Sequence, residues 1–422
     1  MEEKKKTILV YAGWTDGMPA LMGHLYADSM RGKEIFSFEY DKEWLNSAEN
    51  SFMFDPDLSL FQGRQYVSQD KSLFGIFADS CPDRWGRLLM KRREAINARR
   101  EARKPKALTE SDFLLGVYDE SRMGALRFKL EKDEEFLASD KELAAPPWTT
   151  LRKLETASLG FESEGDSLNE KWLNQLLAPG SSLGGARPKA TVQDTAGNLW
   201  IAKFPSKHDE HNSGAWEKTV HDLAKKCNLN VPESKMETFS KNGGTFLVKR
   251  FDRIGKKRIH FASAMTLLGK TDGASSAEGV SYLDIASFIK ANGAEPKTDL
   301  RELWKRIVFS MLVSNTDDHL RNHGFLLTSK GWRLSPMYDV NPDIYGEMLS
   351  LNVDENSSII DVELAIETAK FYGLSTKEAK CIAEDMKMTV IENWESIAAE
   401  YGLSRDEREY MRPAFTEAYK KQ

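Results

Sequence analysis

The sequence predicts an α+β fold in three parts: an N-terminal α+β region, a small sheet with one helix, and a helical C-terminal region. Short strand-like runs separated by turn residues occupy the first two parts, and helical periodicity dominates after residue 282. The chain has 422 residues, more than one hydrophobic core ordinarily organises, so we expect more than one packed unit.

The first predicted domain covers residues 1–150. Residues 7–11 are rich in β-formers and residues 35–40 alternate aromatic with other side chains, and a turn-rich stretch follows each run. Residues 85–103 have a helical pattern, and residues 126–130 return to a strand pattern. A charged, proline-containing connector closes this α+β domain.

The second predicted domain, residues 151–255, is a small sheet with a helix inserted. Strand patterns occur at residues 190–192, 199–204 and 245–251. A helix is expected at residues 215–227, between the last two strands.

The third predicted domain, residues 256–422, is helical. Apolar side chains at i, i+3 and i+4 spacing predict a buried helix that ends near Val313. The later helices are expected at residues 361–371, 376–399 and 404–420. Gly373 and Gly402 stand where C-cap glycines belong.

The net charge of -6 gives the chain no general attraction to nucleic acid. One basic, helix-favouring stretch runs against this average, and we interpret it first as a solvated helix face. Contact of this stretch with DNA or a partner stays open. Its cationic residues are Lys91, Arg92, Arg93, Arg99, Arg100, Arg103, Lys104 and Lys106.

Cysteine usage and hydropathy predict a cytoplasmic protein without membrane contact. The three cysteines lie far apart, without the paired spacing of a zinc site, and they cannot all pair within one chain. No window approaches the roughly 18 apolar residues that a membrane span needs.

The densest polar motif, residues 314–322, directly follows the predicted buried helix. Polar groups at the end of such a helix are costly unless they are hydrogen-bonded or bind a ligand. In a kinase catalytic loop an aspartate accepts the substrate hydroxyl proton, and an asparagine five positions later holds magnesium. Asp317 and Asn322 have this spacing. A plain cap and turn is the alternative interpretation.

A second metal ligand is expected downstream. Residues 325–327 and 332–334 read as two strands of a hairpin around a glycine turn, and the hairpin leads to Asp339. Asp339 would then return beside the 314–322 motif, where oxygen ligands suit Mg²⁺.

Two upstream features fit the phosphate side of a nucleotide site. The glycine-containing loop at residues 181–189 has amides that can face phosphate oxygens, although a simple β-turn explains it equally well. Lys203 lies in a strand pattern, where a kinase-like order places a phosphate-contacting lysine, and an ordinary edge-strand lysine is the alternative. Glu217 is the first candidate to pair with Lys203, and Glu210 is also available.

Together these motifs resemble the HipA family, the kinase toxins of bacterial toxin–antitoxin pairs. The resemblance covers most of the chain, including two N-terminal segments, and it implies a bilobal protein-kinase-like fold with ATP and Mg²⁺ as cofactors. The motifs that carry it are residues 77–86, 124–128, 182–189, 201–205, 248–253, 315–322 and 338–340.

The resemblance also implies roles for single residues. It makes Asp317 the catalytic base, Asn322 and Asp339 the metal ligands, and Ser182 a residue that the enzyme phosphorylates itself to switch its activity off. The residues implied in binding the nucleotide are Lys203, Phe251, Ser182, Gly184, Gly185 and His319. One departure is Lys249, because the family commonly has glutamate there and that contact cannot be carried over.

The implied partners are a protein substrate that is phosphorylated on serine and a helix-turn-helix antitoxin, with DNA contacted only through the antitoxin. Two other functions stay open. His319 and His323 lie four residues apart near Asp317, as in a metal-dependent hydrolase, although Gly324 weakens a continuing helix. A kinase-like module that binds a partner without transferring phosphate is the other alternative.

Overall fold

A computed structural model describes residues 5–15, 18–30, 33–47, 52–132, 135–138, 145–164, 176, 185 and 187–420. The chain forms two compact units. The first comprises Met1–Ser206 and Arg250–Ala262, and the second comprises Lys207–Lys249 and Ser263–Gln422. The predicted three-domain division into residues 1–150, 151–255 and 256–422 stays a prediction.

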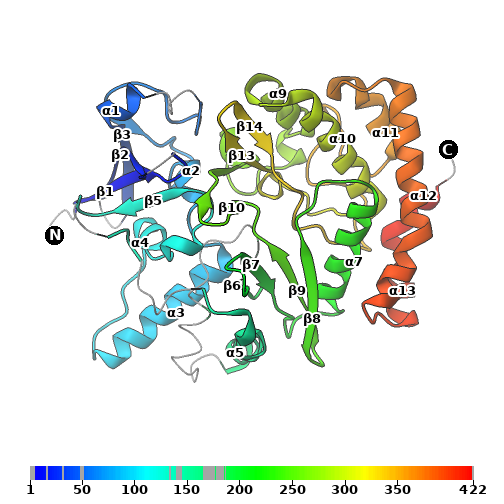
Figure 1. The fold of residues 1–422 in the computed structure, drawn as a ribbon, viewed down its shortest axis with the longest axis horizontal. Coiled ribbons are helices and arrows are strands. Elements are labelled where there is room, and N and C mark those ends of the chain that lie inside the picture. The colour runs from blue at the N-terminus through cyan, green and yellow to red at the C-terminus, as the bar shows by residue number, and fades with distance from the viewer. Residues whose placement is uncertain are drawn as a thin grey trace. The chain divides into compact units, whose positions relative to one another are not determined.

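The first unit contains an antiparallel five-stranded sheet with strand order β4-β3-β2-β1-β5 (Figure 1). The strands of this sheet are β1 (Lys5–Ala12), β2 (Ala20–Met30), β3 (Lys33–Tyr40), β4 (Gln65–Tyr66) and β5 (Leu126–Lys129). The first unit also contains strands β6 (Lys189–Gln193), β7 (Leu199–Lys203), β10 (Arg253–Ile254) and β11 (Lys257–Arg258). The helices of the first unit are α1 (Lys42–Leu45), α2 (Gly75–Ala78), α3 (Arg84–Arg100), α4 (Glu110–Leu115) and α5 (Leu151–Glu164).

The N-terminal strands at residues 7–11, 35–40 and 126–130 are confirmed. The turn-rich interpretation after the first strand is wrong for Ala20–Met30, which forms the long strand β2. Gly23 interrupts the pattern there, because a Cβ on it would lie 2.3 Å from the main-chain oxygen of Glu39. Strand pairing leaves no room for the apolar side chain that alternation would have required.

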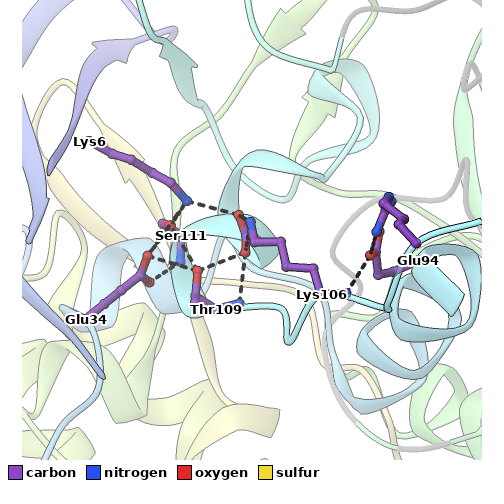
Figure 2. Close-up of polar contacts among 8 residues, drawn as sticks. Lys6, Glu34, Glu94, Lys106, Thr109 and Ser111 are labelled. Carbon is purple, nitrogen blue, oxygen red and sulfur yellow. Dashed lines mark hydrogen bonds and ion pairs between the residues drawn. The ribbon is translucent and has the colours of Figure 1, made fainter. Parts of the chain in front are cut away.

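A polar network fixes the start of α4 to two strands of the sheet (Figure 2). Glu34 of β3 accepts hydrogen bonds from the main-chain nitrogen of Ser111 at 2.9 Å and from the hydroxyl of Thr109 at 2.9 Å. Lys6 of β1 donates to the Ser111 hydroxyl at 2.7 Å and to Asp112 at 3.0 Å. The Glu34 carboxylate thereby satisfies the Ser111 amide, one of the groups that a helix N-terminus leaves unpaired.

The basic stretch at residues 91–106 lies on α3 and the segment after it. Arg103 pairs with Glu94 and Glu101, and the ammonium of Lys106 lies 2.8 Å from Asp112. Acidic neighbours therefore compensate these two cations within the unit. Contact of the stretch with DNA or a partner stays open.

The second unit is mainly helical, with two hairpins (Figure 1). Its helices are α7 (Ser213–Lys226), α8 (Ala264–Leu267), α9 (Tyr282–Asn292), α10 (Pro296–Leu312), α11 (Val362–Thr368), α12 (Thr376–Glu400), α13 (Arg405–Met411) and α14 (Thr416–Tyr419). Its hairpins are β8 (Ser234–Ser240) with β9 (Gly243–Lys249), and β13 (Gly324–Thr328) with β14 (Gly331–Leu334). Strand β12 (Phe261–Ser263) spans the junction of the two units in the chain.

Aromatic packing and a helix-to-helix hydrogen bond hold the helical unit together. Helix α12 packs against α7, α10 and α11, and the ring of Trp394 stacks on Phe415 at 4.4 Å. Trp304 of α10 donates its indole N–H to the main-chain oxygen of Ala365 at 2.7 Å. A hydrogen-bonded indole is the usual state of a buried tryptophan.

The helix predicted to end near Val313 is confirmed as α10, and its apolar stripe is buried. Gly373 and Gly402 have the left-handed φ of C-cap glycines, at 76° and 78°. The single helix expected at residues 404–420 is wrong: α13 gives way to a 3₁₀ turn at Arg412–Phe415 before α14. Pro413 has no amide hydrogen to continue the α-helical ladder.

Within the described part of the chain, no helix combines the length and the apolar composition needed to cross a bilayer.

Candidate functional site

The 314–322 loop begins where α10 ends. Ser314 has a left-handed φ of 47°, which turns the chain away from the helix axis. The amide of Asn315 then donates to the main-chain oxygen of Ser310 at 2.8 Å, so the turn is held against the last helical turn. A non-glycine residue in this region costs of order 1 kcal/mol, and such strain gathers at functional sites.

The adjacent aspartates Asp317 and Asp318 have opposite environments. The side chain of Asp317 is 86% exposed. That of Asp318 is 4% exposed, accepts a hydrogen bond from the Tyr282 hydroxyl at 2.7 Å, and lies 3.1 Å from Nε2 of His323. Asp318 is therefore a structural anchor of the loop, and Asp317 is the carboxylate that a substrate can approach.

The pKa of Asp318 reflects this anchoring. Burial by itself raises the pKa of the carboxyl group, but the charge and hydrogen bond of His323, together with the Tyr282 hydroxyl, hold it below its ordinary value. Burial, reinforced by the charge and hydrogen bond of Asp318, raises the pKa of Tyr282 well above its ordinary value. Asp318 is thus ionised and Tyr282 protonated at neutral pH.

Asn322 joins the two ends of the loop and leaves one atom uncommitted. Its amide Nδ2 donates to the main-chain oxygen of Asp317 at 2.7 Å, so the asparagine is fixed beside the exposed carboxylate. Its Oδ1 is buried and accepts no hydrogen bond from the described residues. An unpaired buried amide oxygen is costly, and a ligand cation would satisfy it.

The segment that carries Asp339 is tied to this loop on both sides. The Tyr338 hydroxyl donates to the main-chain oxygen of Arg321 at 2.6 Å, and the amide of Asn341 donates to the side chain of Asn315 at 3.2 Å. Asp339 lies between these tethers and has a left-handed φ of 57°. The segment that carries Asp339 therefore returns beside the 314–322 loop, as predicted.

One ion pair and one buried arginine connect the preceding hairpin to α10. Asp299 of α10 accepts from Nε of Arg333 at 2.9 Å and from the amide of Leu334 at 3.1 Å. Arg306, also on α10 and 1% exposed, donates to the main-chain oxygen of Ser335 at 2.7 Å. The same helix thus positions both the loop and the chain that leads to Asp339.

His319 and His323 do not share a helical face. Residues 320–322 form a 3₁₀ turn, and His323 follows in an extended conformation. His323 is 2% exposed, whereas Nε2 of His319 lies 3.9 Å from Oδ1 of Asp317. Across the residues that the structure describes, no three His, Cys, Asp or Glu side chains are placed to share a metal ion.

The first unit holds the residues expected on the nucleotide side. Lys203 is 7% exposed and pairs across the β6–β7 hairpin with Lys189, which is 5% exposed. Like charges opposite one another in a sheet repel, and Asp83 offsets this by lying 2.8 Å from the Lys189 ammonium. Glu217 and Glu210 belong to the second unit, so their pairing with Lys203 stays a prediction.

The glycine loop leads into this hairpin. Gly185 is exposed and has a left-handed φ of 77°, a conformation that glycine adopts without steric cost. Its main-chain oxygen lies 3.5 Å from the Lys189 ammonium. Ser182 and Gly184 lie outside the described residues.

The segment around Phe251 is fixed by its charged neighbours. Arg250 and Asp252 are buried and joined at 2.6 Å, and Asp252 also accepts from the amide of Gly124 at 2.8 Å. The ring of Phe251 is half-buried and lies 6.1 Å from that of Phe261. Lys249, the departure from the family pattern, lies 3.3 Å from Glu233.

Sequence reasoning missed the structural roles of Asp83 and of the Asp318–Tyr282 pair. Asp83 caps α3 through the amide of Gly86 at 2.8 Å and also binds Lys189. An aspartate three residues before a glycine at a helix start is a recognisable cap signal. The pairing of Asp318 with Tyr282, 36 positions apart, has no such local signal.

Comparisons with known proteins give one family. The model of the HipA-like C-terminal domain matches residues 181–394, and that of the HipA N-terminal domain matches residues 15–129. A solved complex of Shewanella oneidensis MR-1 HipA, HipB and its operator DNA aligns with a TM-score of 0.66 and 18% identity, covering 97% of this chain and 95% of that one. At this identity the likeness concerns the α+β fold.

Curated relatives match shorter stretches. A "Putative kinase" from Haemophilus influenzae is 30% identical over 128 residues, covering 28% of this chain and 37% of the relative. "Putative kinase Y4mE" from Sinorhizobium fredii is 31% identical over 149 residues, covering 33% of each protein. The chain spans between a third and a half of the length of the curated relatives that it matches.

Proposed function

The chain belongs to the HipA family, and we propose that it is a bilobal, ATP-dependent serine/threonine protein kinase. It would transfer the γ-phosphate of ATP to a serine of a protein substrate. The relatives described as kinases support phosphotransfer, and the argument for this chain comes from its own site.

The observation that carries the proposal is the pairing of an exposed carboxylate with an unsatisfied buried amide oxygen. Asp317 presents its side chain to solvent, while Asn322 is fixed by its hydrogen bond to the main chain of Asp317 and keeps Oδ1 uncommitted. A base for a hydroxyl proton and an oxygen ligand for a metal, five residues apart, are what phosphoryl transfer needs.

Asn322 and Asp339 would hold Mg²⁺, a hard cation that suits amide and carboxylate oxygens. When bound, the ion neutralises charge on the phosphate oxygens. Asp317 would accept the proton of the substrate hydroxyl. The hydroxyl oxygen of the substrate then forms the new bond to phosphorus while the bond between phosphorus and the leaving ADP breaks. Being exposed, Asp317 can reach a side chain offered by another protein.

In the first unit, Lys203 would contact the phosphates, Phe251 would pack against adenine, and the loop containing Gly184 and Gly185 would face the phosphate oxygens. Buried lysines at the Lys189–Lys203 end of the hairpin favour anionic groups there. On the catalytic side, His319 would add a nucleotide contact.

We test the metal ligands with radiolabelled ATP. Asn322→Ala and Asp339→Ala should each lower phosphate transfer at least about 100-fold at 1 mM Mg²⁺, because a lost ligand oxygen removes several kcal/mol of charge stabilisation. Asp385→Asn, an exposed aspartate on α12, is the matched control and should keep wild-type activity. Transfer that survives both ligand variants contradicts the assignment.

The same labelled product tests self-modification. We propose that Ser182 gains the phosphate and that this modification lowers activity. Peptide mass spectrometry should locate the label at Ser182, and Ser182→Ala should lose it while still phosphorylating other proteins. Label found only elsewhere excludes this form of regulation.

A DNA-binding antitoxin completes the proposal. The solved HipA of Shewanella oneidensis was captured with HipB and operator DNA. By extension, this chain would act as a toxin in the cytoplasm that a helix-turn-helix partner restrains, and it would reach DNA through that partner. Co-purification with the product of a neighbouring reading frame, and its absence with unrelated helix-turn-helix proteins, tests this extension.

A further inference from the structure

The first unit contains a cavity of about 530 Å³ at one end of the β6–β7 hairpin. Three chain segments line it: residues 118–127, 193–199 and 253–258. This volume lies in the range of small-molecule sites, about 300 to 1,000 Å³. All the lining residues belong to the first unit.

The wall of this cavity carries more positive than negative groups. The cations are Arg127, Arg253, Lys256 and Arg258, and the carboxylates are those of Asp119 and Glu120. Glu120 is exposed, so only the Asp119 carboxylate, at 3% exposure, compensates the arginines from within the wall.

The layer behind the wall adds to the excess. Arg250 is buried there and pairs with the buried Asp252 at 2.6 Å, and Arg122 is buried with its guanidinium donating to the main-chain oxygens of Leu114 and Val117. Five arginines therefore cluster around two buried carboxylates. Buried charges of one sign are costly unless an opposite charge pairs with them, and in this cluster the arginines outnumber the carboxylates.

Internal contacts fix the arginines in place before any ligand arrives. Asp119 accepts from Nη2 of Arg127 at 2.6 Å and from Nη2 of Arg258 at 2.7 Å. Arg253 donates to Asp252 at 2.7 Å and to the main-chain oxygen of Arg122 at 2.7 Å. Preorganised guanidinium groups bind an oxyanion at a lower entropic cost than mobile side chains do.

The electrostatics agree with an unmet demand for negative charge. Burial, together with the positive charges of Arg250 and Arg258, lowers the pKa of Arg253 to about 9 against the opposing effect of Asp252. Burial likewise lowers the pKa of Arg122 to about 10, although Asp119 opposes the shift. An anion in the cavity would favour the charged form of these groups.

The cavity is separate from the proposed phosphate contacts of the same unit. In the β6–β7 register Lys189 pairs with Lys203 at one end of the hairpin, and Gln193 pairs with Leu199 at the other. Gln193 and Leu199 line the cavity. Four residues of extended strand separate the ends by about 13 Å.

We propose that this cavity is a second anion site, which binds a phosphate-bearing small molecule. Fixed guanidinium groups match the geometry of phosphate oxygens. A multiply charged phosphate group neutralises more of the excess positive charge than a single carboxylate does. The inference does not depend on the proposed kinase activity.

Calorimetric titration with pyrophosphate at constant ionic strength tests the proposal, with two neighbouring charge reversals as a matched pair. Lys256 and Lys257 are both exposed, but only Lys256 lines the cavity. Lys256→Glu should weaken binding about tenfold, the effect of one charge-assisted hydrogen bond, and Lys257→Glu should change it less than twofold. Far-UV circular dichroism checks folding, and Lys256→Ser serves if the reversal unfolds the chain.

Lys203→Ala separates this site from the proposed nucleotide contacts, and it should retain the Lys256-dependent binding. Parallel titrations with inorganic phosphate and AMP identify the source of the phosphate group, since tighter binding of AMP points to a nucleotide. The proposal is overturned by no binding of pyrophosphate, by equal effects of the two charge reversals, or by binding that Lys203→Ala abolishes and Lys256→Glu leaves intact.

Discussion

Asp317→Ala and Asp318→Ala should have opposite consequences, although the two residues are adjacent. Removing the Asp318 carboxylate deprives the Tyr282 hydroxyl and His323 of their partner, and these residues are 0% and 2% exposed. One unsatisfied buried group costs about 1 to 3 kcal/mol, so two of them predict a loss of about 2 to 6 kcal/mol. Asp317, 86% exposed, should change stability by less than about 0.5 kcal/mol.

Urea denaturation followed by tryptophan fluorescence measures the difference. A loss of about 3 kcal/mol lowers the midpoint by about 1 to 3 M urea at ordinary m-values of about 1 to 3 kcal/mol/M. Tyr282→Phe, which removes the hydroxyl and leaves the ring, is the control and should cost less than Asp318→Ala. Equal midpoints for Asp317→Ala and Asp318→Ala would refute the division of roles between the two carboxylates.

Two further predictions concern the first unit. Asp83→Ala removes the cap of α3 and the carboxylate beside buried Lys189, so thermal unfolding should show a loss of stability of about 3 kcal/mol or more. Asp83→Asn keeps the cap and should lose less stability. Equal losses for the two variants would exclude the ion pair as the cause. Burial lowers the pKa of His260 to about 3, so the unfolded chain binds the extra proton between pH 3 and 6.5 and stability falls as the pH drops through that window. His260→Phe keeps an aromatic ring against Trp14 and should reduce that fall in stability by up to about 1.4 kcal/mol per pH unit, measured by urea titrations at pH 7 and 4.5. Burial raises the pKa of Asp55 to about 6, so this residue contributes the opposite pH dependence, and it does so equally in wild type and variant. An unchanged pH profile in the variant would contradict the burial of a neutral imidazole.

The sequence was informative where one element explains its own pattern. The apolar stripe of α10, the hairpin before Asp339 and the C-cap glycines all depend on neighbours within a few residues, and each was predicted at its place. Strand β2 was missed because its pattern depends on a close approach of β3 at Gly23, which no local signal reveals. Pro413 is a local signal that should have ended the last predicted helix earlier.

The site was predictable in part for the same reason. The spacing of Asp317 and Asn322 is local, and the structure joins the two residues by a hydrogen bond. Which of two adjacent aspartates is exposed depends on Tyr282 and His323, whose contacts form only on folding. The arginine-rich cavity was also invisible in the sequence, because its lining comes from three separate segments.

In our proposal the exposed carboxylate of Asp317 accepts the hydroxyl proton during phosphate transfer. The most direct test measures ATP binding and phosphate incorporation side by side for wild type, Asp317→Asn and the Asp385→Asn control. The amide keeps the shape and loses the charge, so ATP affinity should stay within about threefold while transfer falls at least about 100-fold. Wild-type transfer by Asp317→Asn would contradict the claim.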